Sequence, residues 1–255
     1  KGKVEMNFYI WAVIVTIAGL AILYLWVGHW GLKELRYFYL YLILNLPLSA
    51  LVNLAIKRPI GLNLLSLFNL SEDPKLWPLW FLPIANLLAP LTEEAIKILP
   101  VIFSDLRRAL KEKKQALVAG FILGFGFGIG EAWYLAISFT QKMPEYATGS
   151  FWLLFGFFNE RTMAVVVHGC MTAIVLMGFH RNFLKYYLLA VLFHYLANIG
   201  AVLYQSGLLS GEIAYIPILV VVFLIFYYIF RIEKQLRKET PTGMKEKILY
   251  QREKD

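Results

Sequence analysis

Long runs of hydrophobic residues, separated by short polar segments, dominate the amino-acid sequence. A helix needs about 20 consecutive apolar residues to cross the hydrocarbon core of a bilayer. Seven runs meet this requirement, and we expect each of them to form a membrane-spanning helix. The predicted spans are residues 6–27, 35–56, 77–103, 116–140, 159–179, 183–204 and 213–230. The pattern therefore predicts an all-α fold, a polytopic membrane helix bundle with about seven transmembrane helices.

Two shorter apolar segments do not fit this pattern of spans. Residues 63–70 are too few to cross and are expected at the membrane interface. Residues 151–158 either lie at the interface too or extend the helix that follows them. The first span has no small-residue cleavage pattern at its end, so we expect no cleavable secretory signal. The predicted organisation is one transmembrane domain over residues 1–232 and a charged tail over residues 233–255, which extends the last helix and then frays.

The composition agrees with an integral membrane protein, because 59% of the 255 residues are hydrophobic and only 16% are charged. The formal net charge is +8, and the basic residues concentrate in residues 107–114, in residues 181–185 and in the tail. Positive-inside bias explains this clustering, so no nucleic-acid partner is expected. With seven spans the three basic segments share one side, which places the N-terminus outside and the C-terminus in the cytoplasm. Lys57 and Arg58 then fall on the outer side.

Several ionisable residues lie inside the predicted spans, where each costs roughly 3 kcal/mol at the bilayer centre. Glu93 and Glu94 lie one helical turn before Lys97, so the amine can pair with either carboxylate and leaves the other without a partner on its own helix. The unpaired acid predicts a functional role. Pro90 is expected to kink or break this helix, with Thr92 capping a new segment that begins with the two glutamates.

The next three spans each carry polar groups near their middle. Five glycines precede Glu131 and predict the close approach of another helix. Arg161 and His168 lie two helical turns apart on one face, and His194 and Asn198 lie one turn apart. Acids, imidazoles and an amide donor are the groups that activate water and stabilise an oxyanion, so we expect one shared, water-accessible pocket. The expected set is Glu93, Glu94, Lys97, Glu131, His168, His194 and Asn198.

Other kinds of intramembrane chemistry are excluded by the sequence. The only aspartates are Asp73, Asp105 and Asp255, and none of them lies in a predicted span, which excludes a paired-aspartate intramembrane protease. The chain has no GxSxG motif and no HExxH motif. Cys170 is the only cysteine, so the chain has no internal disulfide and no CxxC metal site, and we interpret this residue as a small packing residue.

These motifs resemble those of the membrane protease superfamily that contains the type II CAAX prenyl endopeptidases and the bacterial PrsW proteases. The resemblance covers about residues 90–200, in the central four predicted helices, and four motifs in the same order carry it. They are Glu93 to Lys97, similar to the EExxK of the PrsW branch; Phe127 to Glu131, similar to FxxxE; Arg161 through His168 to Thr172, similar to R…HxxxT; and His194 to Asn198, similar to HxxxN.

The resemblance implies an intramembrane endopeptidase with a catalytic core over residues 77–206, in the plasma membrane of a prokaryote. Its substrate would be a membrane-embedded, membrane-proximal or lipid-linked peptide. The resemblance also implies that Glu93 is the general base, that Glu94 holds Lys97, and that His194 and Asn198 stabilise the oxyanion. Prenyl endopeptidases have a histidine where this chain has Glu131, which disfavours prenylated substrates and suggests that His168 supplies the missing imidazole. Arg161 would have a supporting role.

The cofactor and the catalytic status stay open at this point. Glu93, Glu131, His168 and His194 could together ligate Zn²⁺, so a zinc-dependent protease stands beside a metal-free, glutamate-based one. A non-catalytic membrane scaffold subunit related to these proteases would keep the same polar groups for packing. An ion or proton carrier is disfavoured, because the sequence shows no inverted repeat.

Overall fold

The computed structural model describes residues 8–28, 38–102, 106–142 and 151–239, and all regular elements in these ranges are helical. Within them, six helical segments are long and apolar enough to cross a membrane. The expected all-α membrane helix bundle is therefore confirmed. The longer elements are α1 (Phe8–Gly28), α2 (Phe38–Leu51), α3 (Arg58–Leu67), α4 (Phe81–Lys97), α6 (Lys113–Lys142), α8 (Phe151–Gly178), α9 (Phe183–Gln205) and α11 (Ile216–Glu239). The short ones are η2 (Val52–Lys57), η3 (Pro74–Leu76), α5 (Leu99–Ile102), η4 (Leu106–Lys111) and α10 (Gly211–Ala214).

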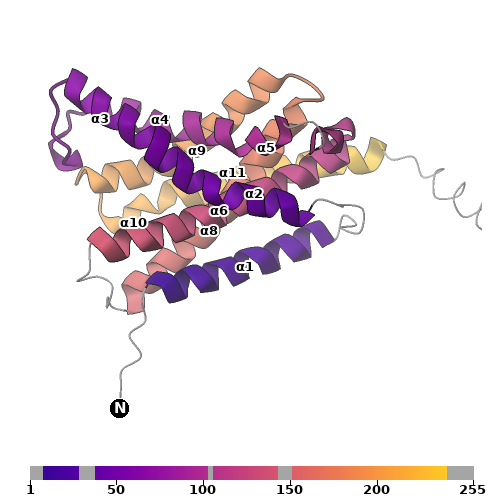
Figure 1. Cartoon of the computed structure of the whole chain (residues 1–255), viewed down its shortest axis with the longest axis horizontal. Helices are drawn as coiled ribbons and strands as arrows, with labels where there is room; N and C mark the ends of the chain where they lie inside the picture. The colour runs from indigo at the N-terminus through magenta and orange to yellow at the C-terminus, as the bar shows by residue number, and fades with distance from the viewer. Residues whose placement is uncertain (1–7, 29–37, 103–105, 143–150, 240–255) are drawn as a thin grey trace, which may run out of the picture.

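The long helices lie side by side along the long axis of the molecule, with α6 and α8 in the middle (Figure 1). The most apolar window of α6 is 89% buried and that of α8 is 78% buried, against 22–33% for the other four spanning segments. The start of α1 and the end of α11 lie at opposite ends of the bundle (Figure 1). This agrees with an odd number of crossings, made by the six spanning segments together with α4. Helix α4 has 17 residues, fewer than any of the six spanning segments.

Glycines bring α6 against its two neighbours at backbone contact distance. A Cβ at Gly124 would overlap the carbonyl oxygen of His168 on α8, and a Cβ at Gly130 would overlap the carbonyl oxygen of Leu46 on α2. The close approach predicted from the glycine-rich stretch is therefore present on two faces of α6, one toward each neighbour. It sets the position of His168 directly, because the His168 backbone rests against Gly124.

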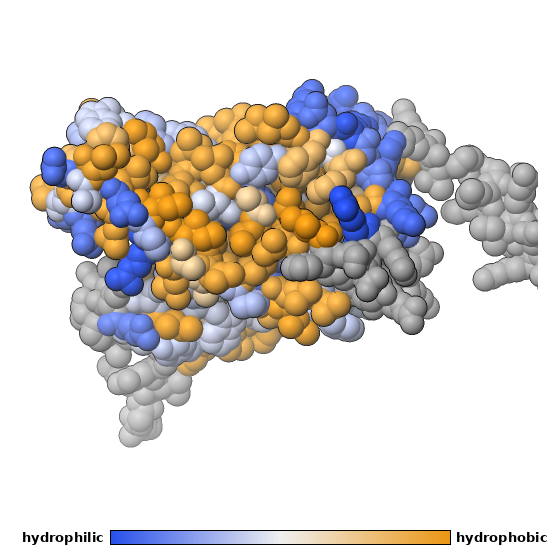
Figure 2. Space-filling view, turned by 45° about the horizontal axis from the view of Figure 1, so that its top comes forward, coloured by the Kyte–Doolittle hydropathy of each residue, from blue (hydrophilic) through white to orange (hydrophobic). Residues whose placement is uncertain are grey.

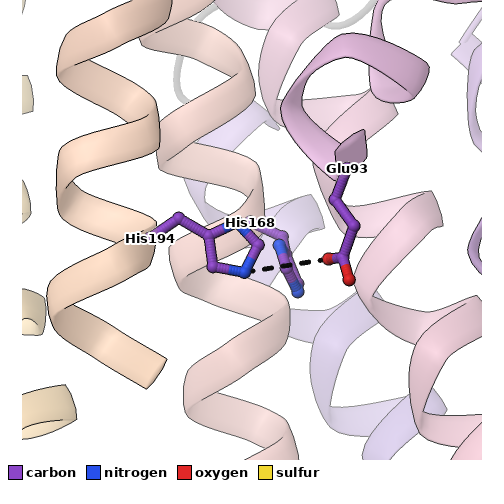
Figure 3. A group of neighbouring side chains, drawn as sticks. All are labelled: Glu93, His168 and His194. Atoms are coloured by element: carbon purple, nitrogen blue, oxygen red, sulfur yellow. Dashed lines mark ion pairs between the residues drawn. The ribbon is translucent and has the colours of Figure 1, made fainter. Parts of the chain in front are cut away.

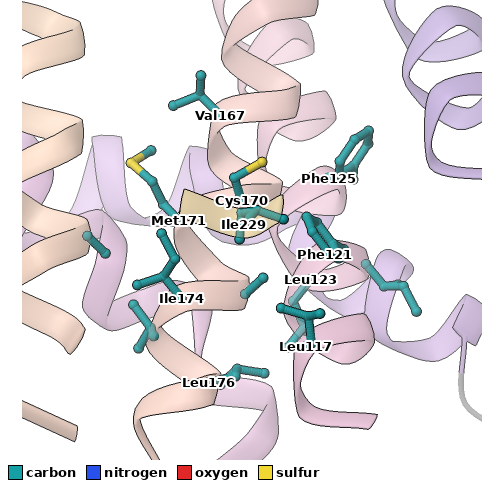
Figure 4. Packing of buried hydrophobic residues seen from close by; sticks show 14 of the residues in the cluster. Leu117, Phe121, Leu123, Phe125, Val167, Cys170, Met171, Ile174, Leu176 and Ile229 are labelled. Carbon is teal, nitrogen blue, oxygen red and sulfur yellow. The ribbon is translucent and has the colours of Figure 1, made fainter. Parts of the chain in front are cut away.

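Apolar side chains fill the space between α6 and α8 and cover most of the outer surface. Leu117, Phe121 and Phe125 from α6 pack near Val167, Cys170 and Met171 from α8, with Ile229 of α11 behind them (Figure 4). Cys170 is fully buried in this cluster, as expected of a packing residue. On the outside, Figure 2 shows an apolar band across the middle of the visible face, with hydrophilic residues gathered toward the two ends. A band of this kind is the surface that contacts lipid.

The second helix is longer than the sequence pattern predicted. A span ending at residue 56 was expected, but α2, η2 and α3 form one continuous helical segment up to Leu67. The first five residues of the segment expected at the interface, residues 63–70, are the last residues of α3, and the interfacial position of this segment stays a prediction. The middle of this segment, Val52–Lys57, is a π-helix. Such wider turns often occur at functional sites, and here the π-helix ends with Lys57.

The helix that carries the two glutamates also differs from the prediction. A kink or a break near Pro90 was expected, and the break is absent, because α4 runs without interruption from Phe81 to Lys97. Thr92 does not cap a new segment, because its hydroxyl donates a hydrogen bond of 2.8 Å back to the carbonyl of Leu88, as threonines inside helices do. The prediction of a helix start at this point is therefore wrong, and the stabilisation of the glutamates by such a helix end does not apply.

Helix α8 begins well before the predicted residue 159, at Phe151. Of the two alternatives for residues 151–158, the extension of the helix is therefore confirmed. This places Arg161 inside α8 rather than at its end. In the predicted tail, α11 continues through residues 233–239, whereas residues 240–255 lie outside the described part of the chain.

Candidate active site

One face of α4 carries the residues that the site is built around. Its buried positions after the first turn are Asn86, Pro90, Glu93, Glu94 and Lys97, which recur every three to four residues and therefore form one stripe. Hydrogen bonds to two neighbouring helices hold the stripe in place. The Asn45 amide of α2 donates 3.0 Å to the Lys97 carbonyl, and the Asn86 amide donates 3.0 Å to the Tyr195 carbonyl of α9.

One carboxylate oxygen of Glu94 accepts hydrogen bonds from two groups. Its Oε1 lies 2.5 Å from Lys97 Nζ and 2.7 Å from His194 Nδ1, and the side chain is fully buried. A carboxylate can only accept, so Nδ1 of His194 carries the proton of this hydrogen bond. In the neutral form of this imidazole, the Nε2 atom on its other side is unprotonated.

His168 is held at both of its ring nitrogens. Lys97 Nζ lies 2.7 Å from Nδ1, and Glu131 Oε2 lies 3.1 Å from Nε2. An ammonium group can only donate, so Nδ1 accepts and Nε2 carries the proton that is donated to Glu131. The ring meets those of Phe127 and His194 edge to face, at centroid distances of 5.3 and 5.2 Å. These contacts fix both the tautomer and the orientation of His168.

Arg161 closes the outer side of the cluster. It donates 2.9 Å to Glu131 Oε2 and also pairs with its neighbour Glu160. Their side chains are 13%, 15% and 29% exposed for Arg161, Glu131 and Glu160, so this part of the cluster is closer to solvent than the glutamates of α4. Arg161 of α8 thus binds the acid of α6.

Glu93 has one fixed oxygen and one free oxygen. Its Oε1 accepts from Lys57 Nζ at 2.6 Å, and its Oε2 is buried and has no hydrogen-bond partner among the described residues. The nearest polar group to Oε2 among the described ion-pair contacts is His194 Nε2, at 3.7 Å. Figure 3 shows Glu93, His168 and His194 converging from three helices, with the His194–Glu93 contact drawn as a dashed line. With a neutral His194, two acceptor atoms face one another at the centre of the cluster.

Comparison with known proteins identifies the family of the chain. The family model of the PrsW family intramembrane metalloproteases matches residues 48–229 of the 255-residue chain. The chain belongs to this family. No curated protein and no solved structure matched it. The match begins within α2 and ends within α11, so it includes every residue of the polar cluster, Lys57 among them.

The description of the PrsW family as metalloproteases raises the question whether these residues suit a metal ion. One ligand atom each from Glu93, His168 and His194 lies within 4.8 Å of the others, and one glutamate with two histidines is a donor set of catalytic zinc sites. Glu93 Oε2 and His194 Nε2 are unprotonated acceptors, and Glu94 accepts from the other nitrogen of His194 as carboxylates do behind zinc-bound histidines. His168 would have to exchange its hydrogen bond with Glu131 for the ion. The donor set fits zinc.

The structure brings together six of the seven residues expected to share a pocket. Glu131 belongs to the cluster, but it lies outside the group of three potential metal ligands and contacts His168 and Arg161 instead. Asn198 is half-buried on α9, one turn after His194, and its side chain forms no hydrogen bond with the described residues. Its expected role as an oxyanion donor stays a prediction.

Lys57 is the residue of this cluster that the sequence reasoning missed. It was assigned to an outer loop, but it lies in the π-helix between α2 and α3 and forms the ion pair with Glu93. The extra acid noted in the sequence thus has its cation on another helix. The sequence did contain a signal. Lys57 and Arg58 are the only charged residues between positions 40 and 70, and two cations isolated in a long apolar stretch indicate a helix that continues through them rather than a loop.

Proposed function

We propose that the protein hydrolyses a peptide bond of a membrane-embedded or membrane-proximal substrate, with the Glu93 carboxylate as general base. The observation that carries this proposal is the asymmetry of Glu93. Lys57 binds one carboxylate oxygen at 2.6 Å, while the other is buried without a partner and lies 3.7 Å from the Nε2 atom of His194. A buried acceptor left unpaired costs about 1–3 kcal/mol, a cost typical of sites kept for catalysis.

The two facing acceptors suit a water molecule that donates to both. A water about 2.8 Å from both Glu93 Oε2 and His194 Nε2 can bridge their 3.7 Å separation with an angle of about 83° at its oxygen, about 20° narrower than the angle between its two O–H bonds. Its lone pairs would then face away from both groups, toward a substrate carbonyl. Glu93 would take the proton as the oxygen attacks and later deliver it to the leaving amine. In this proposal His194 positions the nucleophile, and Glu94 keeps His194 in the required tautomer.

The oxyanion of the tetrahedral intermediate needs a hydrogen-bond donor nearby. Asn198 follows His194 by one turn of α9, and its amide forms no hydrogen bond with the described residues, so it is available to donate. We assign this role to Asn198. The assignment agrees with the HxxxN resemblance. In this proposal His194 positions the attacking water, and the Asn198 amide donates a hydrogen bond to the oxyanion.

A zinc-dependent form of the same hydrolysis is the second candidate. It is favoured by the 4.8 Å grouping of donor atoms from Glu93, His168 and His194, and by the description of the family as metalloproteases. When bound, the ion would polarise the substrate carbonyl and acidify a water molecule. Elemental analysis of the purified, active protein separates the two forms: about one zinc per chain, with activity lost to a chelator and restored by zinc, supports the second.

The cleavage itself is tested by comparing membrane-protein fragments from cells that produce the wild-type chain with those from cells that produce Glu93→Gln. Glu112→Gln is the matched control, because Glu112 is exposed and belongs to no part of the cluster. We expect fragments that appear with the wild type and the control and vanish with Glu93→Gln. Identical fragment sets for all three chains, with all three folded, would contradict the protease proposal and favour a scaffold role.

We also propose the orientation given by the basic residues, with the N-terminus outside and the C-terminus in the cytoplasm of a prokaryotic cell. The opposite placement of the start of α1 and the end of α11 supports an odd number of crossings (Figure 1). The basic element η4 lies after α4 and α5, and the C-terminal part of α11 follows the seventh crossing. Labelling of single cysteines introduced at Lys111 and at Ser71, in intact cells with a membrane-impermeant reagent, tests this orientation. Only the cysteine at position 71 should react.

A further inference from the structure

A second polar feature lies at the C-terminal part of α11, and no residue of the polar cluster takes part in it. It is a cavity of about 330 Å³ between this part of the helix and the turn that joins α8 to α9. Its lining combines two arginines with aromatic and amide groups. The lining residues are Arg181, Tyr227, Tyr228, Arg231, Ile232 and Gln235.

The cavity is positively charged. None of its six described lining residues is acidic, and neither Arg181 nor Arg231 forms an ion pair within the described part of the chain. Arg181 donates 2.8 Å to the Tyr186 hydroxyl and more weakly, at 3.4 Å, to Gln235. Each guanidinium has five N–H donors, so these bonds leave several donors of both arginines unused. Two guanidinium groups on one cavity suit an anion with several oxygens.

The height of the cavity along α11 indicates which anion can reach it. Phe223 and Phe230 are 76% and 62% exposed, as expected of side chains that face lipid tails, and Arg231 begins the polar end of the helix. The cavity therefore lies where the lipid-facing surface ends, which is the level of the phospholipid headgroups. The exposed Arg231 side chain also contacts its own helix: it donates 3.1 Å to the Tyr227 hydroxyl and lies 5.8 Å from that ring.

We propose that this cavity binds a phosphate-bearing anion through Arg181 and Arg231. The headgroup of an acidic phospholipid and a free phosphate share this chemistry, and the guanidinium groups would bind the phosphate oxygens in either case. The position at the end of the lipid-facing surface makes the headgroup the occupant that the experiment tests first. Binding there would strengthen the connection between the α8–α9 turn and α11. Among the described residues, Arg181 of the turn forms one hydrogen bond to α11, the 3.4 Å bond to Gln235.

The experiment measures thermal unfolding of the full chain in a neutral detergent, with increasing amounts of three probes. The probes are short-chain phosphatidylglycerol, short-chain phosphatidylcholine and inorganic phosphate. The variant Arg181→Gln/Arg231→Gln removes two charges at the cavity, and Lys111→Gln/Lys114→Gln removes two exposed charges elsewhere as a matched control. Ligands that bind only the folded protein raise its Tm in a concentration-dependent way.

We expect phosphatidylglycerol to raise the Tm of the wild type and of the lysine control, and to bind the arginine variant at least tenfold more weakly. A matching effect of inorganic phosphate, also lost in the arginine variant, would assign the site to free phosphate. No rise in Tm of the wild type with any probe, or an equal rise in the arginine variant, overturns the proposal. If the double variant does not fold, Arg231→Gln alone is used, and binding no weaker than that of the lysine control again overturns it.

Discussion

Replacement of Lys57 by methionine tests the least expected contact of the site. Methionine keeps most of the side-chain volume and removes the charge that lies 2.6 Å from Glu93 Oε1. Glu93 is 1% exposed, and Lys57 is the only lysine or arginine paired with it among the described residues. Removing one partner of a buried ion pair costs about 3–5 kcal/mol, because the other charge stays buried. Since the Lys57 side chain is 22% exposed, the pair is not fully buried and we expect the lower end of this range, about 3 kcal/mol.

The assay is equilibrium unfolding in mixed micelles for Lys57→Met, Glu93→Gln and the double variant. A neutral glutamine no longer needs the cation, so the second substitution should cost much less in the presence of the first. We expect a coupling free energy of about 2 kcal/mol in this cycle, the size found for residues in direct contact. Single substitutions that simply add up would show that the ion pair contributes nothing to the folded state.

Two further variants make the test specific to the ion pair. Arg58→Met removes the neighbouring, exposed cation of the same helical segment and should change the free energy of unfolding by less than about 0.5 kcal/mol. Lys57→Arg keeps the charge and should restore most of both stability and activity. If Lys57 orients Glu93, Lys57→Met should also lower kcat about 100-fold with little change in KM. Equal effects of Lys57→Met and Arg58→Met would refute the reasoning.

Three other predictions follow from the geometry of the cluster. Glu93→Gln should lower kcat/KM by about 10³ while the protein still elutes as a folded species, because a general base is lost; unchanged turnover would reject the base assignment. Gly124→Ala should cost about 3 kcal/mol in unfolding, because its methyl group overlaps the His168 carbonyl, whereas Gly61→Ala, with only a 4.0 Å contact, should be neutral or stabilising. In a zinc-containing preparation, His194→Gln should release the metal in elemental analysis; retained zinc would remove His194 from the ligand set.

Most of the fold could be predicted because the bilayer restricts it. Apolar runs of sufficient length must be helices that satisfy their own backbone, so α1, α6, α9 and α11 follow from the sequence to within a few residues at most boundaries. The errors fell where the rules of local sequence compete with packing. Pro90 was expected to break α4, yet the helix continues through it, in contact with α9, whose Tyr187 hydroxyl binds the Leu91 carbonyl at 2.7 Å.

Most residues of the site could be predicted from the sequence, but only some of the contacts between them. Helical spacing is enough to place Lys97 beside Glu94, because both residues lie on one helix. It cannot choose the partners of His168, which binds Lys97 on one nitrogen and Glu131 on the other, from two different helices. Lys57 was missed for the same reason: its partner is 36 residues away, and only the packing of the π-helix against α4 brings them together.

The charges of the cluster divide into a balanced inner part and an outer part with excess negative charge. Lys57 pairs with Glu93 and Lys97 pairs with Glu94, so the groups of α4 and the π-helix sum to zero. Outside them, one arginine serves two acids, and these three side chains are 13–29% exposed. The unbalanced negative charge therefore lies among side chains that are less buried than Glu93 and Glu94, which lowers the cost of an unpaired charge.

This balance bears on where the proposed reaction can form its oxyanion. When water attacks with Glu93 as the base, the carboxylate becomes neutral and the negative charge moves to the substrate oxygen, so the net charge of the inner part stays the same. The Lys57 ammonium, which is 2.6 Å from Glu93 in the resting site, then loses its partner and attracts the new charge. In the proposed reaction, the transition state is therefore best stabilised with the oxyanion on the Lys57 side of Glu93. If Asn198 is the donor, Asn198→Ala should lower kcat about 100-fold and leave KM nearly unchanged; an effect on KM alone would assign Asn198 to substrate binding.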